Sequence, residues 1–197
     1  TYRQQSSPRA LEQKRDPNNR LLWRFSPRRL AAEVLRDSIL HCSGQLDLSM
    51  HGPGFAFFQR ASFFSGAIPE SQLGANTWRR MIYGTKIRQE TVNVFGEFDC
   101  PDAGQMTPRR SHSTTPLQAL NLFNSEFVNH QTQLFANEVQ RAAGPDPQEQ
   151  VRLAVLVCLG RLPDAEEQTR LCDLLLATGL SQVCRVLLNT NEFVFLN

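Results

Sequence analysis

The sequence lacks a long apolar run and lacks a strong excess of either charge. A helix that crosses a bilayer needs about 20 consecutive apolar residues, so we expect no membrane span. The 21 basic and 19 acidic residues leave a formal net charge of only +2. That balance gives no broad basic field, so we also expect no nucleic-acid binding.

The cysteines lack the spacings of common metal and haem motifs. Neither Cys-x-x-Cys nor Cys-x-x-Cys-His occurs, so the chain carries no zinc ribbon and no covalent haem site, and we expect no cofactor in it. Four of the five cysteines lie in apolar segments with helical spacing, where cysteine usually acts as a small hydrophobe. The odd count leaves at least one thiol free and weakens the interpretation as a disulfide framework.

Recognised catalytic motifs are also missing. The sequence has no Gly-x-Ser-x-Gly elbow, no Walker loop, no dinucleotide fingerprint and no His-Glu-x-x-His pair. Its four histidines show no paired ligand spacing, which favours surface or core histidines over a metal site. No reaction can be assigned from these patterns, and whether the chain is an enzyme stays open.

What is present suits one globular domain over residues 1–197, since 41% of the residues are hydrophobic. The pattern predicts a mainly α fold: an irregular helical domain with a long loop-rich insertion and a small β element. Its expected parts are a helix at 26–43, a loop-rich segment with a possible hairpin at 44–113, and a helical part at 114–197. We expect this chain to be the C-terminal part of a longer polypeptide.

The first helix is predicted to begin at Ser26, with Pro27 in its first turn, and to stop before Gly44. Its apolar positions recur at helical spacing. On the opposite face Arg29, Glu33 and Arg36 are three and four residues apart and can pair on the helix surface.

The middle segment is rich in glycine and phenylalanine. Five phenylalanines between Phe55 and Phe64 suggest either a small satellite core under a loop, which we favour, or an exposed contact patch. Residues 78–88 alternate loosely enough to predict a strand, with Met81, Tyr83 and Ile87 on one face.

Capping signals divide the last part into helices. Thr115 and Gln118 fit a capping box, with a possible kink at Asn124-Ser125, and Asp146 and Asp164 each begin a further helix. Residues 151–159 are apolar nearly all round, which predicts a buried central helix. A last helix near 181–190 is followed by aromatic residues that we expect to pin the C-terminal segment to the core.

Charged residues gather at turns and at the predicted helix starts. Converged guanidinium groups would bind carboxylate, sulfate or phosphate, although adjacent arginines are more often solvated or paired with local acids. Asp99 and Asp102 are three positions apart; they could bind a hard cation, but turn formation is the favoured role. The candidate ligand-binding residues are Asp16, Arg20, Trp23, Arg24, Arg28, Arg29, Asp99, Asp102, Arg109 and Arg110.

We expect these groups to form one polar network that either locks loops together or receives an anion. Trp23 is included because its flat ring offers a stacking surface for a guanidinium or a sugar. An anionic glycan is therefore a candidate partner.

Several segments resemble one known family. They include Asp-Pro-Asn-Asn-Arg-Leu-Leu-Trp-Arg at 16–24, Phe-Asp-Cys-Pro-Asp at 98–102 and Pro-Arg-Arg-Ser-His-Ser-Thr-Thr-Pro-Leu-Gln-Ala-Leu at 108–120. The chain resembles, over nearly its whole length, the C-terminal domain of unknown function 1553 of planctomycete cytochrome-c-associated proteins. The resemblance implies upstream domains in the same polypeptide, among them a possible haem c domain, and an extracytoplasmic (periplasmic or secreted) location. It implies no established reaction.

Two functions follow as hypotheses. The first is a noncatalytic accessory module of an exported multidomain protein, serving in scaffolding or in binding a ligand or partner. The alternative is part of an extracytoplasmic enzyme that acts on polysaccharide or in a haem-linked redox step. A glycosidase would need two carboxylates facing a cleft, and Asp99 or Asp102 could pair with a distant acid such as Asp16 or Asp37.

Overall fold

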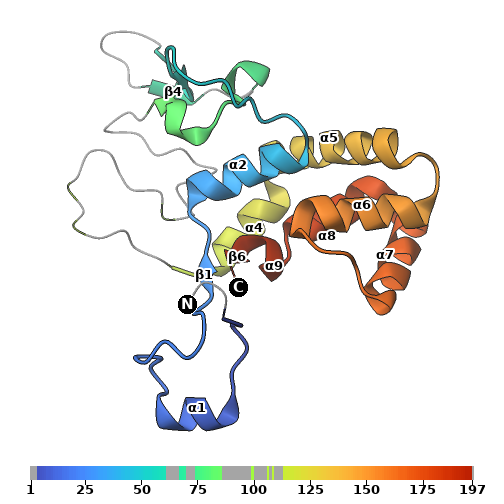
Figure 1. Cartoon of the computed structure of the whole chain (residues 1–197). Helices are drawn as coiled ribbons and strands as arrows, with labels where there is room; N and C mark the ends of the chain where they lie inside the picture. The colour runs from blue at the N-terminus through green and yellow to red at the C-terminus, as the bar shows by residue number, and fades with distance from the viewer. Residues whose placement is uncertain are drawn as a thin grey trace.

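The computed structural model describes residues 4–60, 67–69, 74–85, 99, 106, 108 and 113–196. The predicted mainly α class is confirmed, with most helices in the second half of the chain (Figure 1). The helices are α1 (Ala10–Arg15), α2 (Ala32–Cys42), α4 (Pro116–Asn124), α5 (Glu126–Ala143), α6 (Pro147–Leu159), α7 (Ala165–Thr178), α8 (Leu180–Leu188) and α9 (Asn191–Val194).

The β structure consists of short paired segments. Strand β1 (Arg28–Arg29) pairs antiparallel with β6 (Phe195–Leu196), so segments from opposite ends of the described chain lie side by side. Strand β2 (Phe55–Ala56) pairs parallel with β5 (Gly84–Thr85), and β3 (Phe58–Arg60) pairs antiparallel with β4 (Ala67–Pro69). The last two pairs lie in the predicted loop-rich segment and form its small β element.

The first long helix starts later than the sequence predicts. It begins at Ala32 rather than Ser26, because Arg28 and Arg29 pair with β6 and the Leu30 N–H donates to the Val194 carbonyl at 2.8 Å. These long-range bonds replace the first helical turn. The predicted stop is confirmed, since α2 ends at Cys42 and Gly44 adopts a positive φ of 70°.

The strand predicted at 78–88 is wrong over its first half. After the 3₁₀ turn η1 (Ala75–Thr77), the described residues of this stretch form an isolated parallel bridge from Arg79 to Asp47, a second 3₁₀ turn at η2 (Met81–Tyr83) and the short strand β5. The Met81 N–H donates to an Asp37 carboxylate oxygen at 2.8 Å, which holds this turn against α2. Ile87 lies outside the described residues.

The predicted helix starts after residue 114 are confirmed. Thr115 and Asp164 each form a capping box, and the Asp146 side chain accepts from the Gln148 N–H at 3.0 Å. The predicted kink is a full break, because Ser125 separates α4 from α5.

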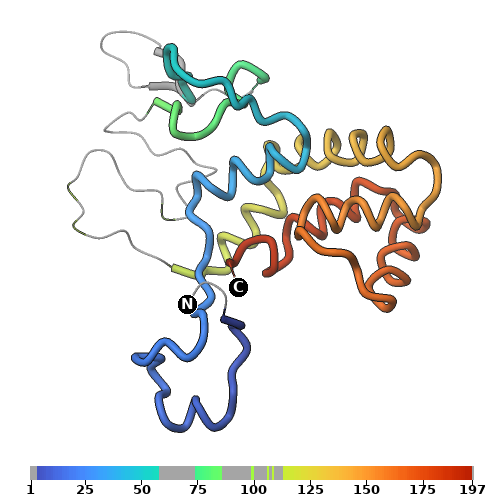
Figure 2. Tube along the Cα trace, in the orientation of Figure 1, coloured from blue at the N-terminus to red at the C-terminus, as the bar shows by residue number. Residues whose placement is uncertain are grey.

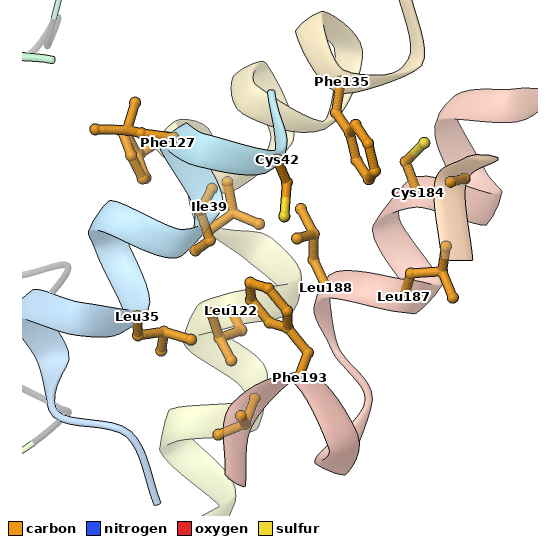
Figure 3. Close-up of a cluster of buried hydrophobic side chains, with 14 of the residues drawn as sticks. Leu35, Ile39, Cys42, Leu122, Phe127, Phe135, Cys184, Leu187, Leu188 and Phe193 are labelled. Atoms are coloured by element: carbon orange, nitrogen blue, oxygen red, sulfur yellow. The ribbon is translucent and has the colours of Figure 1, made fainter. Parts of the chain in front are cut away.

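The main core lies where α2, α5, α8 and α9 meet (Figure 3). Leu35 of α2 points toward Leu122 of α4, while Ile39 of α2 and Phe135 of α5 lie on either side of Leu188 of α8, and all five are buried. Phe193 of α9 is also buried, which confirms that aromatic residues pin the C-terminal segment to the core.

The prediction that the helix at 151–159 is buried all round was too broad. Helix α6 is buried on one face only, since Leu156 and Val157 are 41% and 38% exposed. Helix α4 also exposes apolar side chains, among them Leu117 and Leu120.

The described part of the aromatic middle segment packs into the core. Phe55 and Phe57 are buried and meet edge to face, with ring centroids 5.0 Å apart. Their burial agrees with the favoured interpretation as a core, but the two residues belong to the same cluster as the main core and do not form a separate satellite. The side chains of Phe58, Phe63 and Phe64 lie outside the described part.

Candidate functional site

Arg29 and Asp99, both predicted site residues, form an ion pair. The Arg29 Nη2 atom lies 2.5 Å from an Asp99 carboxylate oxygen, and the two side chains are only 5% and 14% exposed. The Ser113 N–H and hydroxyl donate to the same carboxylate at 2.6 and 2.8 Å, and Gln118 donates to the Ser113 hydroxyl at 3.0 Å. This Arg29 clasp (Arg29, Asp99, Ser113 and Gln118) ties β1 to the start of α4.

Asp16 organises a separate closed loop near the start of the chain (Figure 2). The Phe25 N–H donates to the Gln5 carbonyl at 3.4 Å and closes the loop, which contains α1. Within it, the Leu21 N–H donates to the Asp16 carboxylate at 2.7 Å and the Trp23 indole donates to the Asp16 carbonyl at 2.9 Å. The hydrogen bond from Leu21 holds the pKa of Asp16 below its usual value.

Arginines stack on the aromatic rings of this loop. The Arg24 guanidinium lies 5.1 Å from the Trp23 ring centroid, and that of Arg28 lies 6.0 Å from the Phe25 ring. Trp23 therefore serves as a stacking surface for a guanidinium of its own chain, while Arg20 and Arg28 are exposed.

The structure thus brings the predicted residues into two groups rather than showing one network. Arg29 joins Asp99 in the clasp, and Asp16, Trp23 and Arg24 belong to the closed loop. The predicted residues Asp102, Arg109 and Arg110 lie outside the described residues.

A buried arginine was not foreseen. Arg36 is fully buried, and its guanidinium donates to the carbonyls of Thr77 and Arg79. The expectation that Arg36 pairs on the helix surface is wrong, because the insertion folds over this face of α2. Burial lowers the pKa of Arg36 to about 10.

Aromatic rings surround the Arg36 guanidinium. It lies 5.2, 5.6 and 5.7 Å from the ring centroids of Phe55, Phe57 and Phe127. These faces and the two carbonyls provide the favourable electrostatic contacts that a buried cation needs. The cluster of phenylalanines at 55–64 was the sequence signal that could have indicated a buried arginine nearby.

Asp37, the residue after Arg36, also connects α2 to the segment around η2. One carboxylate oxygen accepts from the Met81 N–H and lies 3.5 Å from the Arg36 guanidinium, and the other lies 3.9 Å from that of Arg80. Burial is the largest influence on this carboxyl and raises its pKa.

A cavity of about 420 Å³ lies between α2, α6 and α9. Apolar side chains supply part of its wall, and its chemically active lining residues are Asp37, His41, Cys42, Cys158 and Glu192. Sequence reasoning missed this site because its walls come from segments more than 100 positions apart, joined for example by the contact between Cys42 and Val157, 115 positions apart.

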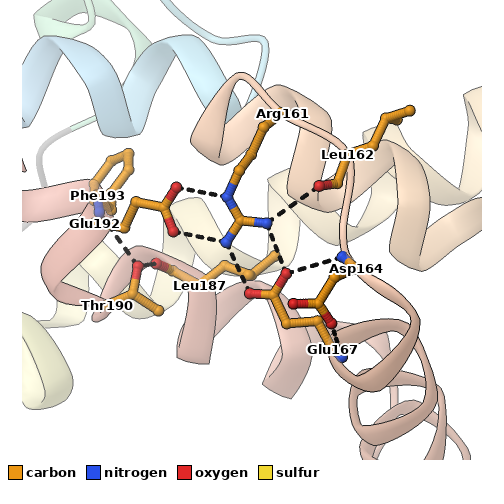
Figure 4. Close-up of polar contacts among 8 residues, drawn as sticks. All are labelled: Arg161, Leu162, Asp164, Glu167, Leu187, Thr190, Glu192 and Phe193. Carbon is orange, nitrogen blue, oxygen red and sulfur yellow. Dashed lines mark hydrogen bonds and ion pairs between the residues drawn. The ribbon is translucent and has the colours of Figure 1, made fainter. Parts of the chain in front are cut away.

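An arginine clamp stands beside this cavity (Figure 4). Arg161 donates to both oxygens of Glu192 at 2.6 and 2.7 Å and to both oxygens of Glu167 at 2.6 and 2.8 Å. Hydrogen bonds from these carboxylates raise the pKa of Arg161. Because Glu167 also closes the Asp164 capping box, the Arg161 clamp (Arg161, Glu167 and Glu192) joins α7 to α9.

Within the described part of the chain, no group of three or more His, Cys, Asp or Glu residues is placed to hold a metal ion. The search for membrane-spanning helices over the same residues likewise finds no helix that is both long and apolar enough.

Comparison with known families decides the chain's affiliation. The family model described as PSD1, protein of unknown function (DUF1553), matches residues 1–175. The chain belongs to this family. No curated protein matches the chain, and no solved structure does. Membership in this DUF1553 family assigns no reaction, so function must be argued from the contacts described above.

Proposed function

We propose that this DUF1553 domain is a noncatalytic accessory module of a larger exported protein, with a scaffolding and partner-docking role beside upstream domains. One observation carries the proposal: the Arg29 guanidinium, a predicted ligand-binding group, binds Asp99 of its own chain in a nearly dry setting. The same carboxylate accepts two bonds from Ser113. A carboxylate satisfied in this way favours a structural clasp over an open anion site.

Other arginines support the same proposal. Arg79 donates to the carbonyls of Ser49, His51 and Pro53 at 2.7 to 2.9 Å and stacks on Tyr83, so it fixes the loop that leads into β2. In each case a guanidinium holds a stretch of irregular backbone. Backbone groups in such a stretch lack the regular partners that a helix or a strand provides. Such clasps suit a rigid docking surface.

The clasp can be tested with a matched pair of variants. Arg29→Gln removes the charge-assisted bond to Asp99 and leaves the two bonds from Ser113, so we expect a loss of about 1.5–3 kcal/mol in the free energy of unfolding. Arg28→Gln changes the neighbouring exposed arginine and should cost less than about 0.5 kcal/mol. Urea denaturation measures both. Equal losses of stability in the two variants would contradict a structural role for the clasp.

Ligand binding is tested separately by thermal unfolding with dextran sulfate and with polygalacturonate. A ligand that binds only the folded state must raise the unfolding midpoint. The scaffolding proposal expects no saturable shift. A saturable shift that Arg28→Gln abolishes would instead establish the anionic-glycan function.

The carboxyl groups that line the cavity support a second candidate function, an enzyme. Asp37 and Glu192 both line it, and Asp37 has a raised pKa while both Glu192 oxygens accept from Arg161. Two carboxyl groups on the wall of one cavity are the groups that glycoside hydrolysis uses. The exported location and the upstream haem domain remain part of the proposal in either case.

Release of reducing ends from a panel of polysaccharides would test this candidate. Activity that Glu192→Gln and Asp37→Asn both remove, while Arg28→Gln retains it, would favour the enzyme. Absence of turnover on every polysaccharide, together with an unshifted melt, would favour the accessory module.

A further inference from the structure

The cavity contains two thiols that meet across a helix interface. Cys42 ends α2 and Cys158 lies in the last turn of α6, and both line the cavity. The Cys42 thiol lies 3.9 Å from the carbonyl oxygen of Val157, the residue next to Cys158, and it is close enough to Cys158 to be the largest cause of that thiol's raised pKa. Both cysteines are free.

We propose that Cys42 and Cys158 form an oxidisable dithiol, at which a disulfide oxidant of the glutathione class links α2 to α6. Cys184 is a poorer partner because it is fully buried in α8, whereas Cys158 is only partly buried and faces the cavity. The proposal does not depend on the exported location, since the oxidant is supplied in the test.

The reaction is an ordinary two-step exchange. The Cys158 thiolate attacks one sulfur of oxidised glutathione, the glutathione S–S bond breaks, and the first glutathione leaves and takes up a proton. Cys42 then attacks the Cys158 sulfur of the mixed disulfide, which forms the protein disulfide and releases the second glutathione. The protein loses two electrons and two protons, and one oxidised glutathione becomes two reduced ones.

The surroundings of Cys158 determine how fast the disulfide forms, and its position determines what the disulfide does to the cavity. The neighbouring Cys42 side chain and burial raise the pKa of Cys158, so thiolate is scarce at neutral pH. We expect oxidation to be slow at pH 7 and roughly 10-fold faster or more at pH 9. The new bond would fix one wall of the cavity.

Peptide mapping tests the pairing directly. The reduced full chain is incubated with oxidised glutathione, alkylated with iodoacetamide and digested. We expect a linked peptide that joins Cys42 to Cys158, with Cys172 alkylated. Recovery of Cys158 alkylated, only glutathionylated, or joined to a different cysteine would overturn the proposal.

Matched variants add a second readout. The oxidised wild-type chain should melt roughly 5–15 °C above the reduced chain, because the crosslink closes a long loop. Cys158→Ser should abolish this difference and Cys172→Ser should retain it, since Cys172 instead contacts the Pro147 carbonyl at 3.8 Å. A difference that persists in Cys158→Ser would contradict the assigned pair. Should Cys158→Ser fail to fold, the wild-type peptide map decides alone.

Discussion

At the scale of single residues, Arg36 is the clearest case of a charge used inside the fold. It is fully buried, it donates to two carbonyls of the insertion, and its neighbours are phenylalanine rings. Local spacing placed it on a helix surface, because sequence spacing carries no information about which distant segment covers a helix face. Its burial follows only from the position of Phe55 and Phe57.

Replacing Arg36 should therefore loosen the insertion. Arg36→Met keeps an apolar side chain of similar length but leaves the Thr77 and Arg79 carbonyls without their donor. We expect a loss of about 2–4 kcal/mol in the free energy of unfolding, measured by urea denaturation. The control is Arg80→Met, whose side chain is 56% exposed and makes only a 3.9 Å contact with Asp37; it should cost less than about 0.5 kcal/mol. Equal losses for both would refute this role.

Glu167 supplies a prediction on acid stability. Hydrogen bonds from Arg161 lower the pKa of Glu167 below its ordinary 4.5, so its ionised form is more favourable in the folded chain. Its stabilising contribution is present above pH 4.5 and is lost as the pH falls through the lower folded value. Asp37 acts in the opposite sense, because burial raises its pKa and the folded chain binds that proton more readily.

Glu167→Gln should accordingly lose less stability than the wild type when the pH is lowered from 5 to 3. Arg161→Gln should flatten the same pH dependence, since it removes the cause of the lowered pKa. Thermal midpoints across this range measure both effects. An unchanged acid dependence in both variants would show that the clamp does not govern it.

At the scale of elements, the caps were predictable and the strand pairing was not. Thr115 and Asp164 act on backbone N–H groups within three residues, so the sequence alone places those helix starts. The start of α2 depends instead on β6, which pairs with Arg28 and Arg29 from the far end of the chain. A favourable Ser-Pro start at 26–27 was overridden by that long-range pairing.

The Asp164 cap can be measured against a neighbour in the same helical turn. Asp164 accepts from the Glu167 N–H at 2.8 Å, so Asp164→Ala should destabilise the fold by about 0.5–2 kcal/mol. Glu166→Ala alters a side chain that is 73% exposed and pairs only along the helix with Arg170, so its cost should be smaller. Chemical denaturation ranks the two, and the reverse order would contradict the capping role.

At the scale of the whole molecule, sequence reasoning predicted the fold class and named both charged residues of the Arg29 clasp. Arg29 and Asp99 were both candidates, and they meet. The cavity and the Arg161 clamp were missed, because Glu192 and Arg161 lie 31 positions apart and no local pattern brings them together. Clusters of charged residues in the sequence indicate which segments arginines stabilise. Only the fold shows which carboxylate or carbonyl each arginine binds.

The pairing of β1 with β6 has a consequence for biosynthesis. The strand partner of Arg28, Leu196, and the Val194 carbonyl that receives the Leu30 N–H emerge from the ribosome more than 160 residues after Arg28 and Leu30. Leu35 and Ile39 of α2 therefore lack part of their core packing, from α8 and α9, until the end of this segment has been translated. Slow translation would lengthen the time during which this apolar helix face is open to chaperones and to aggregation.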